Sequence, residues 1–257
     1  MTQSRAGLWA VVPVKLFAES KQRLATLLDR DQRIALARAM LDDVLAGLTR
    51  SPALAGVLVI TGDGEAAAIA RAMGALVIAD DENAGTNAAA TRAARHLAAS
   101  GSSGMLVVPA DVPLITPADV DTIVAVHRGA PAVTLVPASM DGGTNALACS
   151  PPDALPLCFG DDSYTRHRDA ALAQGIQPHT VRLARVGRDI DTLEDVADFL
   201  MHPSPTHTYA WLTSPPLAER LQAGLSLRAP RASGAVGVAI PGIPAPYGMA
   251  SSRRFSQ

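Results

Sequence analysis

Short apolar runs recur along the first half of the chain, and the segments between them have a helical pattern. The runs are residues 8–14, 57–60, 76–78, 105–108 and 133–136. After the first run, apolar residues repeat at the spacing of an amphipathic helix, at Ile34, Ala37, Leu41, Val44 and Leu48. Strands that alternate with helices in this way predict an α/β domain whose sheet is mainly parallel.

Three polar clusters have the composition of helix starts. They are Asp29 with Gln32, Thr116 with Pro117 and Asp119, and Thr192 with Asp195. The last two follow Asp111 and Asp191 closely along the chain. Because open α/β sheets bind ligands beyond the carboxyl ends of their strands, we expect both aspartates at that edge.

The pattern changes after residue 200. Residues 201–257 contain eight prolines and many serine, glycine and alanine residues. We therefore expect one domain over residues 1–200 and an irregular or disordered tail over 201–257, in which only a short helix near 216–223 is compatible with the pattern.

Composition limits the class of protein. A chain of 257 residues that is 48% hydrophobic can build a sizeable core, and its net charge of -2 indicates no broad basic surface for a nucleic acid. No apolar stretch approaches the ~20 residues of a membrane span, and no signal peptide is recognisable, so we expect a cytoplasmic protein without a membrane partner. The spacing of Cys149 and Cys158 fits no zinc motif, so both are expected to be free thiols.

Two segments have the chemistry of a nucleotide site. Lys15 ends the first apolar run, and Lys21 and Arg23 follow in the next loop, where they could neutralise a triphosphate. A solvated basic loop explains the same residues equally well. Gly85, Thr86 and Asn87 precede an alanine-rich helix, whose first amides could bind an anion or a base edge, although a simple helix cap explains them too.

Three aspartates are candidate ligands of Mg²⁺. Asp111 follows a buried strand between two prolines, and Asp189 and Asp191 alternate along an extended segment, so that both point to one side. Two negative charges so near each other repel, which costs free energy unless a cation lies between them. Alternatively, Asp111 satisfies the amides of its turn, Asp191 or Thr192 caps the next helix, and Asp189 pairs with Arg188.

Two glycine-containing turns could bind a phosphate or a carboxylate through backbone amides and hydroxyl groups. They are residues 142–145, Gly-Gly-Thr-Asn, and residues 159–163, Phe-Gly-Asp-Asp-Ser. Hairpin turns are the alternative, and Asp161 and Asp162 argue against a simple anion site. No histidine is expected to be catalytic, and the sequence has no phosphate loop, nucleophile elbow or dinucleotide fingerprint.

In their order along residues 8–200, these motifs resemble the guanylyltransferases that begin assembly of the deazaflavin coenzyme factor 420. The motifs are Val-Pro-Val-Lys, Ser-Lys-Gln-Arg-Leu, Gly-Thr-Asn-Ala-Ala, Pro-Ala-Asp-Val-Pro-Leu, Gly-Thr-Asn-Ala-Leu, Phe-Gly-x-x-Ser and Asp-Ile-Asp-Thr. The resemblance implies a Rossmann-like nucleotidyltransferase fold with a mixed, mostly parallel sheet. It also implies transfer of GMP from GTP to the phosphate of phosphoenolpyruvate, 3-phosphoglycerate or 2-phospholactate, and it favours a homodimer.

The resemblance assigns roles to the candidate residues. The metal carboxylates are Asp111, Asp189 and Asp191, the contacts to the phosphorylated acid are Thr144, Gly160 and Ser163, and the nucleotide side is Lys15, Lys21, Arg23, Gly85 and Asn87. Lys15, Lys21 and Asp111 are the expected catalytic residues. A phosphate monoester is already anionic at pH 7, so the transfer needs no general base. The alternatives are a nucleotidyltransferase or glycosyltransferase for a sugar or polyol phosphate, and a nucleotide-binding protein without turnover.

Overall fold

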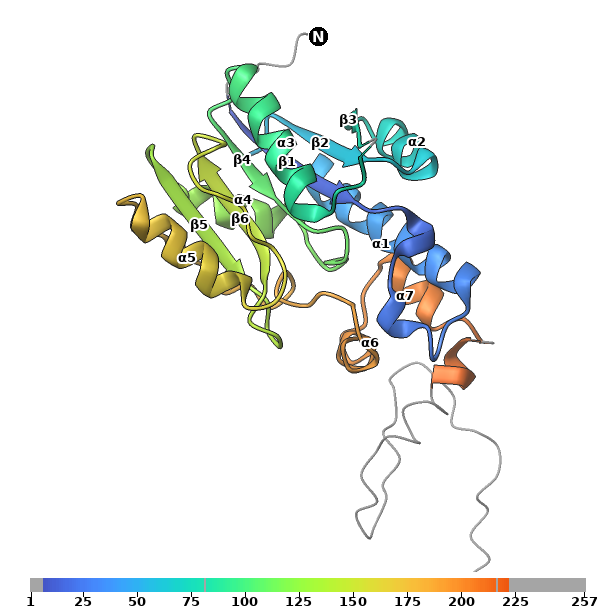
Figure 1. The fold of residues 1–257 in the computed structure, drawn as a ribbon. Helices are drawn as coiled ribbons and strands as arrows, with labels where there is room; N and C mark the ends of the chain where they lie inside the picture. The colour runs from blue at the N-terminus through green and yellow to red at the C-terminus, as the bar shows by residue number, and fades with distance from the viewer. Residues whose placement is uncertain (1–6, 81, 216, 222–257) are drawn as a thin grey trace, which may run out of the picture.

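The protein is a layered α/β structure in which helices cover both faces of one central sheet (Figure 1). The computed structural model describes residues 7–80, 82–215 and 217–221. The strands are β1 (Leu8–Val14), β2 (Gly56–Thr61), β3 (Leu76–Ala79), β4 (Gly104–Val107), β5 (Ala132–Pro137), β6 (Thr144–Ser150) and β7 (His179–Thr180).

The sheet has the order β3-β2-β1-β4-β6-β5-β7. The strands β1 to β4 pair in parallel, β6 is antiparallel to both of its neighbours, and β7 is parallel to β5. This confirms the expected α/β fold with a mixed, mostly parallel sheet. All five expected strands are present, whereas β6 and β7 were not predicted.

The helices form a layer on each face of the sheet. They are α1 (Arg30–Thr49), α2 (Gly64–Ala72), α3 (Thr86–Ala99), α4 (Pro117–Val126), α5 (Ser163–Ala173), α6 (Leu193–Leu200) and α7 (His207–Leu212). Side chains of β1 alternate between two apolar cores. Ala10 and Val12 pack with α1, and Trp9 and Val11 pack with α3, because successive side chains of a strand point to opposite faces.

The expected helix starts are confirmed. Asp29, Thr116 and Thr192 are the N-caps of α1, α4 and α6, and each takes part in a reciprocal capping box with the residue three positions later.

The direction of β6 matters for function. Since β6 is antiparallel, its first residue, Thr144, lies at the same edge of the sheet as the carboxyl ends of β1 and β4.

Ordered structure continues beyond residue 200, where we expected an irregular tail to begin. The helix α7 packs beside α1 (Figure 1), and the Asp43 carboxylate of α1 accepts hydrogen bonds from the backbone N–H groups of His207 and Thr208. Leu212 and Leu221 are fully buried. The many prolines and small residues obscured this short apolar pattern. The rest of the expected tail, 222–257, lies outside the described residues.

Within the part of the chain that the structure describes, no helix is both long and apolar enough to cross a bilayer. In the same residues, Cys149 and Cys158 are free thiols, as their spacing predicted.

Candidate functional site

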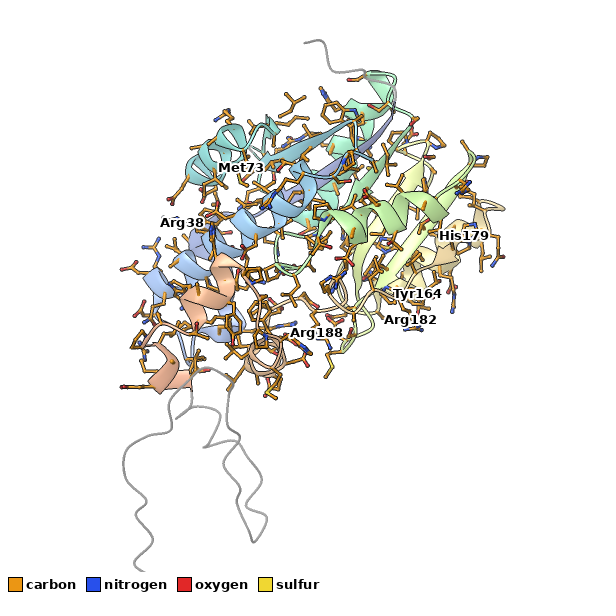
Figure 2. All side chains as sticks on the ribbon, turned by 180° about the vertical axis from the view of Figure 1, so that it is seen from behind. Arg38, Met73, Tyr164, His179, Arg182 and Arg188 are labelled. Carbon is orange, nitrogen blue, oxygen red and sulfur yellow. The ribbon has the colours of Figure 1, made fainter. Side chains whose placement is uncertain are left out.

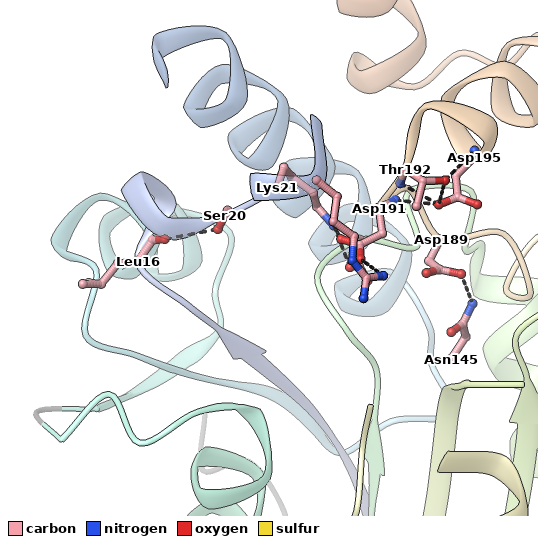
Figure 3. Close-up of polar contacts among 10 residues, drawn as sticks. Leu16, Ser20, Lys21, Asn145, Asp189, Asp191, Thr192 and Asp195 are labelled. Carbon is pink, nitrogen blue, oxygen red and sulfur yellow. Dashed lines mark hydrogen bonds and ion pairs between the residues drawn. The ribbon is translucent and has the colours of Figure 1, made fainter. Parts of the chain in front are cut away.

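Three aspartates lie beyond the carboxyl ends of the central strands. Asp111 follows β4, and Asp189 and Asp191, which Figure 3 labels, lead into α6. The backbone N–H of Ile190 donates to the carbonyl oxygen of Asp111 at 3.0 Å, which fixes the two segments together. Ile190 itself is fully buried.

The ammonium group of Lys21 lies between two of these carboxylates. Its Nζ is 2.7 Å from Asp111 Oδ2 and 3.4 Å from Asp191 Oδ1, and Arg23 contacts the other oxygen of Asp191 at 3.1 Å. Burial lowers the pKa of Lys21, but the charges of Asp111, Asp191 and Asp189 outweigh it and raise the pKa above its usual value. Lys21 therefore stays charged at neutral pH.

The backbone at Lys21 has the left-handed conformation, with φ of 55°. This region is uncommon for residues other than glycine and costs free energy that the surrounding contacts must offset. The two ion pairs of the nearly buried side chain supply such contacts. Strain of this kind concentrates at functional sites, which fits the position of Lys21 here.

Asp189 is held by Asn145 at the start of β6. The amide nitrogen of Asn145 donates to Asp189 Oδ1 at 2.9 Å and to the carbonyl oxygen of Val186 at 3.0 Å. Burial and the nearby charge of Asp111 raise the pKa of Asp189. A cation close to Asp189 would offset both effects.

Of the alternatives considered for these aspartates, the structure shows one, the cap of α6 by Thr192. Arg188, which Figure 2 labels, binds Asp198 of α6 and not Asp189. Thr192, and not Asp191, provides the side-chain cap of α6. Neither the carboxylate of Asp189 nor that of Asp191 therefore serves as the side-chain cap of α6.

The donor set fits Mg²⁺, which prefers carboxylate oxygens together with phosphate oxygens and water. In the described residues, no three acidic, histidine or cysteine side chains already surround one point, and Lys21 lies between Asp111 and Asp191. Asp111, Asp189 and Asp191 would have to turn toward a shared ion as it binds. Their assignment as metal ligands stays a prediction.

A cleft of about 390 Å³ opens in front of Lys21. Its lining includes predicted site residues from three segments: Lys15, Lys21, Arg23, Asp111 and Asp191. Thr86, the first residue of α3, also lines the cleft, and Gly85 borders an adjoining recess beside Lys15. The structure thus brings Lys15, Lys21 and Arg23 to the same cleft as Asp111 and Asp191, whereas Asn87 and Asp189 are not among the residues that line it.

Asn87 makes a contact that the sequence did not reveal. Its Oδ1 accepts a hydrogen bond from the Phe159 N–H at 2.6 Å, and its Nδ2 donates to the Phe159 carbonyl oxygen at 3.1 Å. The side chain therefore connects α3 to the turn that contains Gly160. One N–H of its amide is left for the predicted nucleotide contact, which stays a prediction.

The residues predicted for the phosphorylated acid also lie together. The Tyr164 N–H donates to the carbonyl oxygen of Gly142 at 3.1 Å, so that the first turn of α5 lies against the loop before Thr144. Gly160 and Asp162 have φ of 121° and 52°, which turns the chain sharply into α5. Asp161 and Asp162 are exposed.

Two helices at this edge begin without a side-chain cap. They are α3, which follows Gly85, and α5, which begins at Ser163. The other described α-helices are capped by Asp29, Asp63, Thr116, Thr192 and Thr206. Uncapped first-turn amides and the positive end of the helix dipole favour anions. These two starts are on the nucleotide side and the acid side, respectively.

Sequence reasoning missed His167, to which no role was assigned. Its Nδ1 is 3.0 Å from Thr144 Oγ1, and its Nε2 accepts a hydrogen bond from the Cys158 N–H at 3.0 Å. The signal was present, since His167 lies one helical turn after Ser163 and therefore faces the same way. Asn145 was also missed as a site residue, although it belongs to a motif singled out from the sequence.

Comparison with known families adds to this geometry. The family described as "Guanylyl transferase CofC like" matches residues 8–228. The chain belongs to this family. The match confirms the resemblance found in the sequence, and it makes the protein a nucleotidyltransferase of the guanylyltransferase type.

Relatives of the CofC-like chain cover most of its length. It is 39% identical to the phosphoenolpyruvate guanylyltransferase of Roseiflexus sp. (strain RS-1) over 77% of this chain and 86% of the relative. It is 31% identical to the 2-phospho-L-lactate guanylyltransferase of Methanothermobacter thermautotrophicus, over 79% and 88%. It is 32% identical to the 3-phospho-D-glycerate guanylyltransferase of Colwellia psychrerythraea, over 76% and 92%.

Solved structures resemble the CofC-like chain in fold. A structure from Desulfovibrio desulfuricans G20, assigned as a nucleotide-diphospho-sugar transferase, has a TM-score of 0.68 at 18% identity and covers 85% of this chain and 98% of its own. A nucleotidyl transferase from Methanothermobacter thermautotrophicus has a TM-score of 0.55 at 20% identity and covers 75% and 95%. These likenesses confirm the nucleotidyltransferase fold.

Proposed function

We propose that the protein transfers GMP from GTP to the phosphate of a three-carbon phospho-acid and releases pyrophosphate, as a step in biosynthesis of the deazaflavin coenzyme factor 420. Membership of the guanylyltransferase family supports this reaction, as do the names of relatives at 31–41% identity. We further propose that it works in the cytoplasm as a homodimer.

One observation carries the proposal. Lys21 lies at the junction between the cleft and the carboxylates, in contact with Asp111 and Asp191. Next to these carboxylates, Asp189 accepts a hydrogen bond from Asn145. Asn145 directly follows Thr144, a residue of the proposed acid side. A nucleotide in the cleft and an acid beside Thr144 would therefore meet at the aspartates.

The chain's own groups account for most of the chemistry. In the proposed reaction, Lys15, Lys21 and Arg23 bind the triphosphate, and Thr144, Gly160 and Ser163 hold the acid so that its phosphate oxygen faces the α-phosphorus. That oxygen is anionic at pH 7, so no protein base is required. Positioning and charge neutralisation supply the catalysis. Mg²⁺ held by Asp111, Asp189 and Asp191 would add positive charge next to the phosphate oxygens.

Among the three candidate acids we propose phosphoenolpyruvate as the acceptor. Relatives with that activity in their name reach 39% and 41% identity, whereas the 2-phospholactate and 3-phosphoglycerate relatives named above are 31% and 32% identical. The exposed Asp161 and Asp162 lie beside the proposed acid site, where their charges would influence the choice among acids.

A direct assay tests the proposed function. The purified full chain is incubated with Mg²⁺, one of the four nucleoside triphosphates and one of the three acids, and pyrophosphate release and product mass are measured. We expect a GMP adduct of phosphoenolpyruvate. Sugar and polyol phosphates serve as control acceptors, and turnover with them but with none of the acids would refute the proposal. Tight GTP binding without pyrophosphate release would instead indicate a protein that binds nucleotides without turnover.

A further inference from the structure

The turn formed by residues 158–163, here called the acceptor turn, is held by side chains from two helices. Asn87 of α3 binds both backbone groups of Phe159, at 2.6 and 3.1 Å. His167 of α5 accepts the N–H of Cys158 at 3.0 Å. The rings of Phe159 and His167 also meet edge to face, with centroids 4.8 Å apart. Three consecutive peptide units leading to Gly160 are therefore held by side chains.

The hydrogen bonds define the tautomer of His167. A backbone N–H can only donate, so Nε2, which faces the Cys158 N–H, must be unprotonated. In a neutral imidazole the other nitrogen then carries the hydrogen, and Nδ1–H donates to Thr144 Oγ1. Burial, reinforced by Arg166, lowers the pKa of His167 to about 4, which keeps this neutral form at physiological pH.

This tautomer determines what Thr144 can do. Its hydroxyl oxygen accepts from His167, so its own hydrogen is left to donate to another group. Thr144 is nearly buried at the start of β6, next to Asn145, which binds Asp189. A donor fixed in this place suits the phosphate or carboxylate oxygen of a small acid.

We infer that His167 is a positioning residue for the phosphorylated acid, which orients the Thr144 hydroxyl as a donor and, together with Asn87, holds the acceptor turn in its binding shape. The inference rests on the proposed function, because it takes Thr144, Gly160 and Ser163 as the acid's contacts. His167 transfers no proton in this role. Asn87 thereby connects the helix on the nucleotide side to the acid side of the site.

The chain offers a matched control in His127. Its Nδ1 is 3.0 Å from the Thr134 hydroxyl and its Nε2 is 2.9 Å from the Ser150 hydroxyl, and burial lowers its pKa as well. It lies near Ser150 at the end of β6, whereas Thr144 begins that strand. Loss of either histidine removes a similar pair of hydrogen bonds, but only His167 contacts the proposed acid site.

The test compares His167→Gln with His127→Gln. A glutamine at 167 can still accept from Cys158 but no longer donates to Thr144 in the same way. We expect the KM for the acid to rise roughly tenfold, the effect of losing one well-placed hydrogen bond, while the KM for GTP and kcat change by less than about twofold. The His127→Gln protein should have a similar loss of thermal stability and an unchanged KM for the acid.

The outcomes separate this inference from the proposed function. If the unaltered protein forms no GMP adduct with any acid, the proposed function fails. If it does, and His167→Gln leaves the KM for the acid unchanged or raises both KM values equally, the positioning role is refuted. A double variant with Asn87→Ala adds a second criterion, because residues that hold one turn should have a combined effect on the KM for the acid smaller than the product of their separate effects.

Discussion

At the scale of single residues, Lys21 pairs with aspartates that are also the proposed ligands of Mg²⁺. It neutralises Asp111 and Asp191 in the structure. It also lies where a nucleotide phosphate would compete for its ammonium group and Mg²⁺ would compete for the carboxylate oxygens. The charge of Lys21 reduces the repulsion between Asp111 and Asp191. If these carboxylates bound Mg²⁺, phosphate oxygens would be the new partners of Lys21.

Removing the charge of Asp111 should abolish most activity without unfolding the protein. In Asp111→Asn, Lys21 keeps Asp191 as a partner, but the proposed metal site loses one of three carboxylates. We expect kcat/KM to fall on the order of 10²-fold or more. Steady-state kinetics and circular dichroism measure the two effects. Asp153→Asn, on the exposed loop after β6, is the control, and equal activity in both variants would refute the role of Asp111.

The buried neutral His167 should make stability depend on pH. Its pKa is about 4 in the folded protein and about 6.5 in an unfolded chain, so the unfolded state binds more protons between these values. The stability present above pH 6.5 is lost as the pH falls toward 4. From pH 7 to pH 5 the contribution is about 2 kcal/mol. Urea unfolding at both pH values should show a smaller decrease for His167→Gln than for the unaltered protein.

The sequence indicated the charged residues of the candidate site but not all of their partners. Lysines and aspartates at strand ends were predicted because charged side chains in those places need compensation. The contact of Asn87 with Phe159 depends on two segments that are distant along the chain and adjacent in space. The pairing of Arg188 with Asp198 depends on how α6 is placed. Neither contact leaves a local pattern in the sequence.

At the scale of elements, helix starts were predictable and the reversed strand was not. Capping boxes involve residues three apart, so the sequence shows them directly, as at Thr192 and Asp195. The strand β6 follows two glycines and is antiparallel to both neighbours, and its pairing is determined by contacts with β4 and β5. The direction of β6 brings Thr144 to the edge where β1 and β4 end, so the missed strand carries part of the candidate site.

The cap of α6 should affect both stability and activity. Asp195 accepts from the backbone N–H groups of Asp191 and Thr192, and Thr192 caps the helix in return. Thr192→Ala is expected to cost about 1 kcal/mol and, by loosening the position of Asp191, to lower kcat/KM on the order of tenfold. Thr116→Ala removes the equivalent cap of α4 and should cost similar stability with little loss of activity. Equal activity in the two variants would contradict the coupling of α6 to the site.

At the scale of the whole molecule, α7 completes the core. Residues 201–215 and 217–221 return to α1, where Asp43 binds the start of α7, and Arg220 contacts Gln32 and the carbonyl oxygen of Leu27. The family match to residue 228 extends through this region. The domain therefore includes at least residues 7–80, 82–215 and 217–221, and it does not end at 200.

The packing of α7 on α1 should contribute to stability and not to catalysis. Leu212 is fully buried in the core on the α1 face and does not line the cleft. Leu212→Ala should lower the free energy of unfolding by about 2–5 kcal/mol, because it removes buried methyl groups and leaves a cavity. Leu172→Ala, at a residue that is 46% exposed, should change it by less than about 0.5 kcal/mol. Under conditions where both variants are folded, their KM values for GTP and for the acid should match those of the unaltered protein. A large rise in either KM for Leu212→Ala alone would mean that α7 shapes the site through α1, whose Ala37 and Met40 line the cleft.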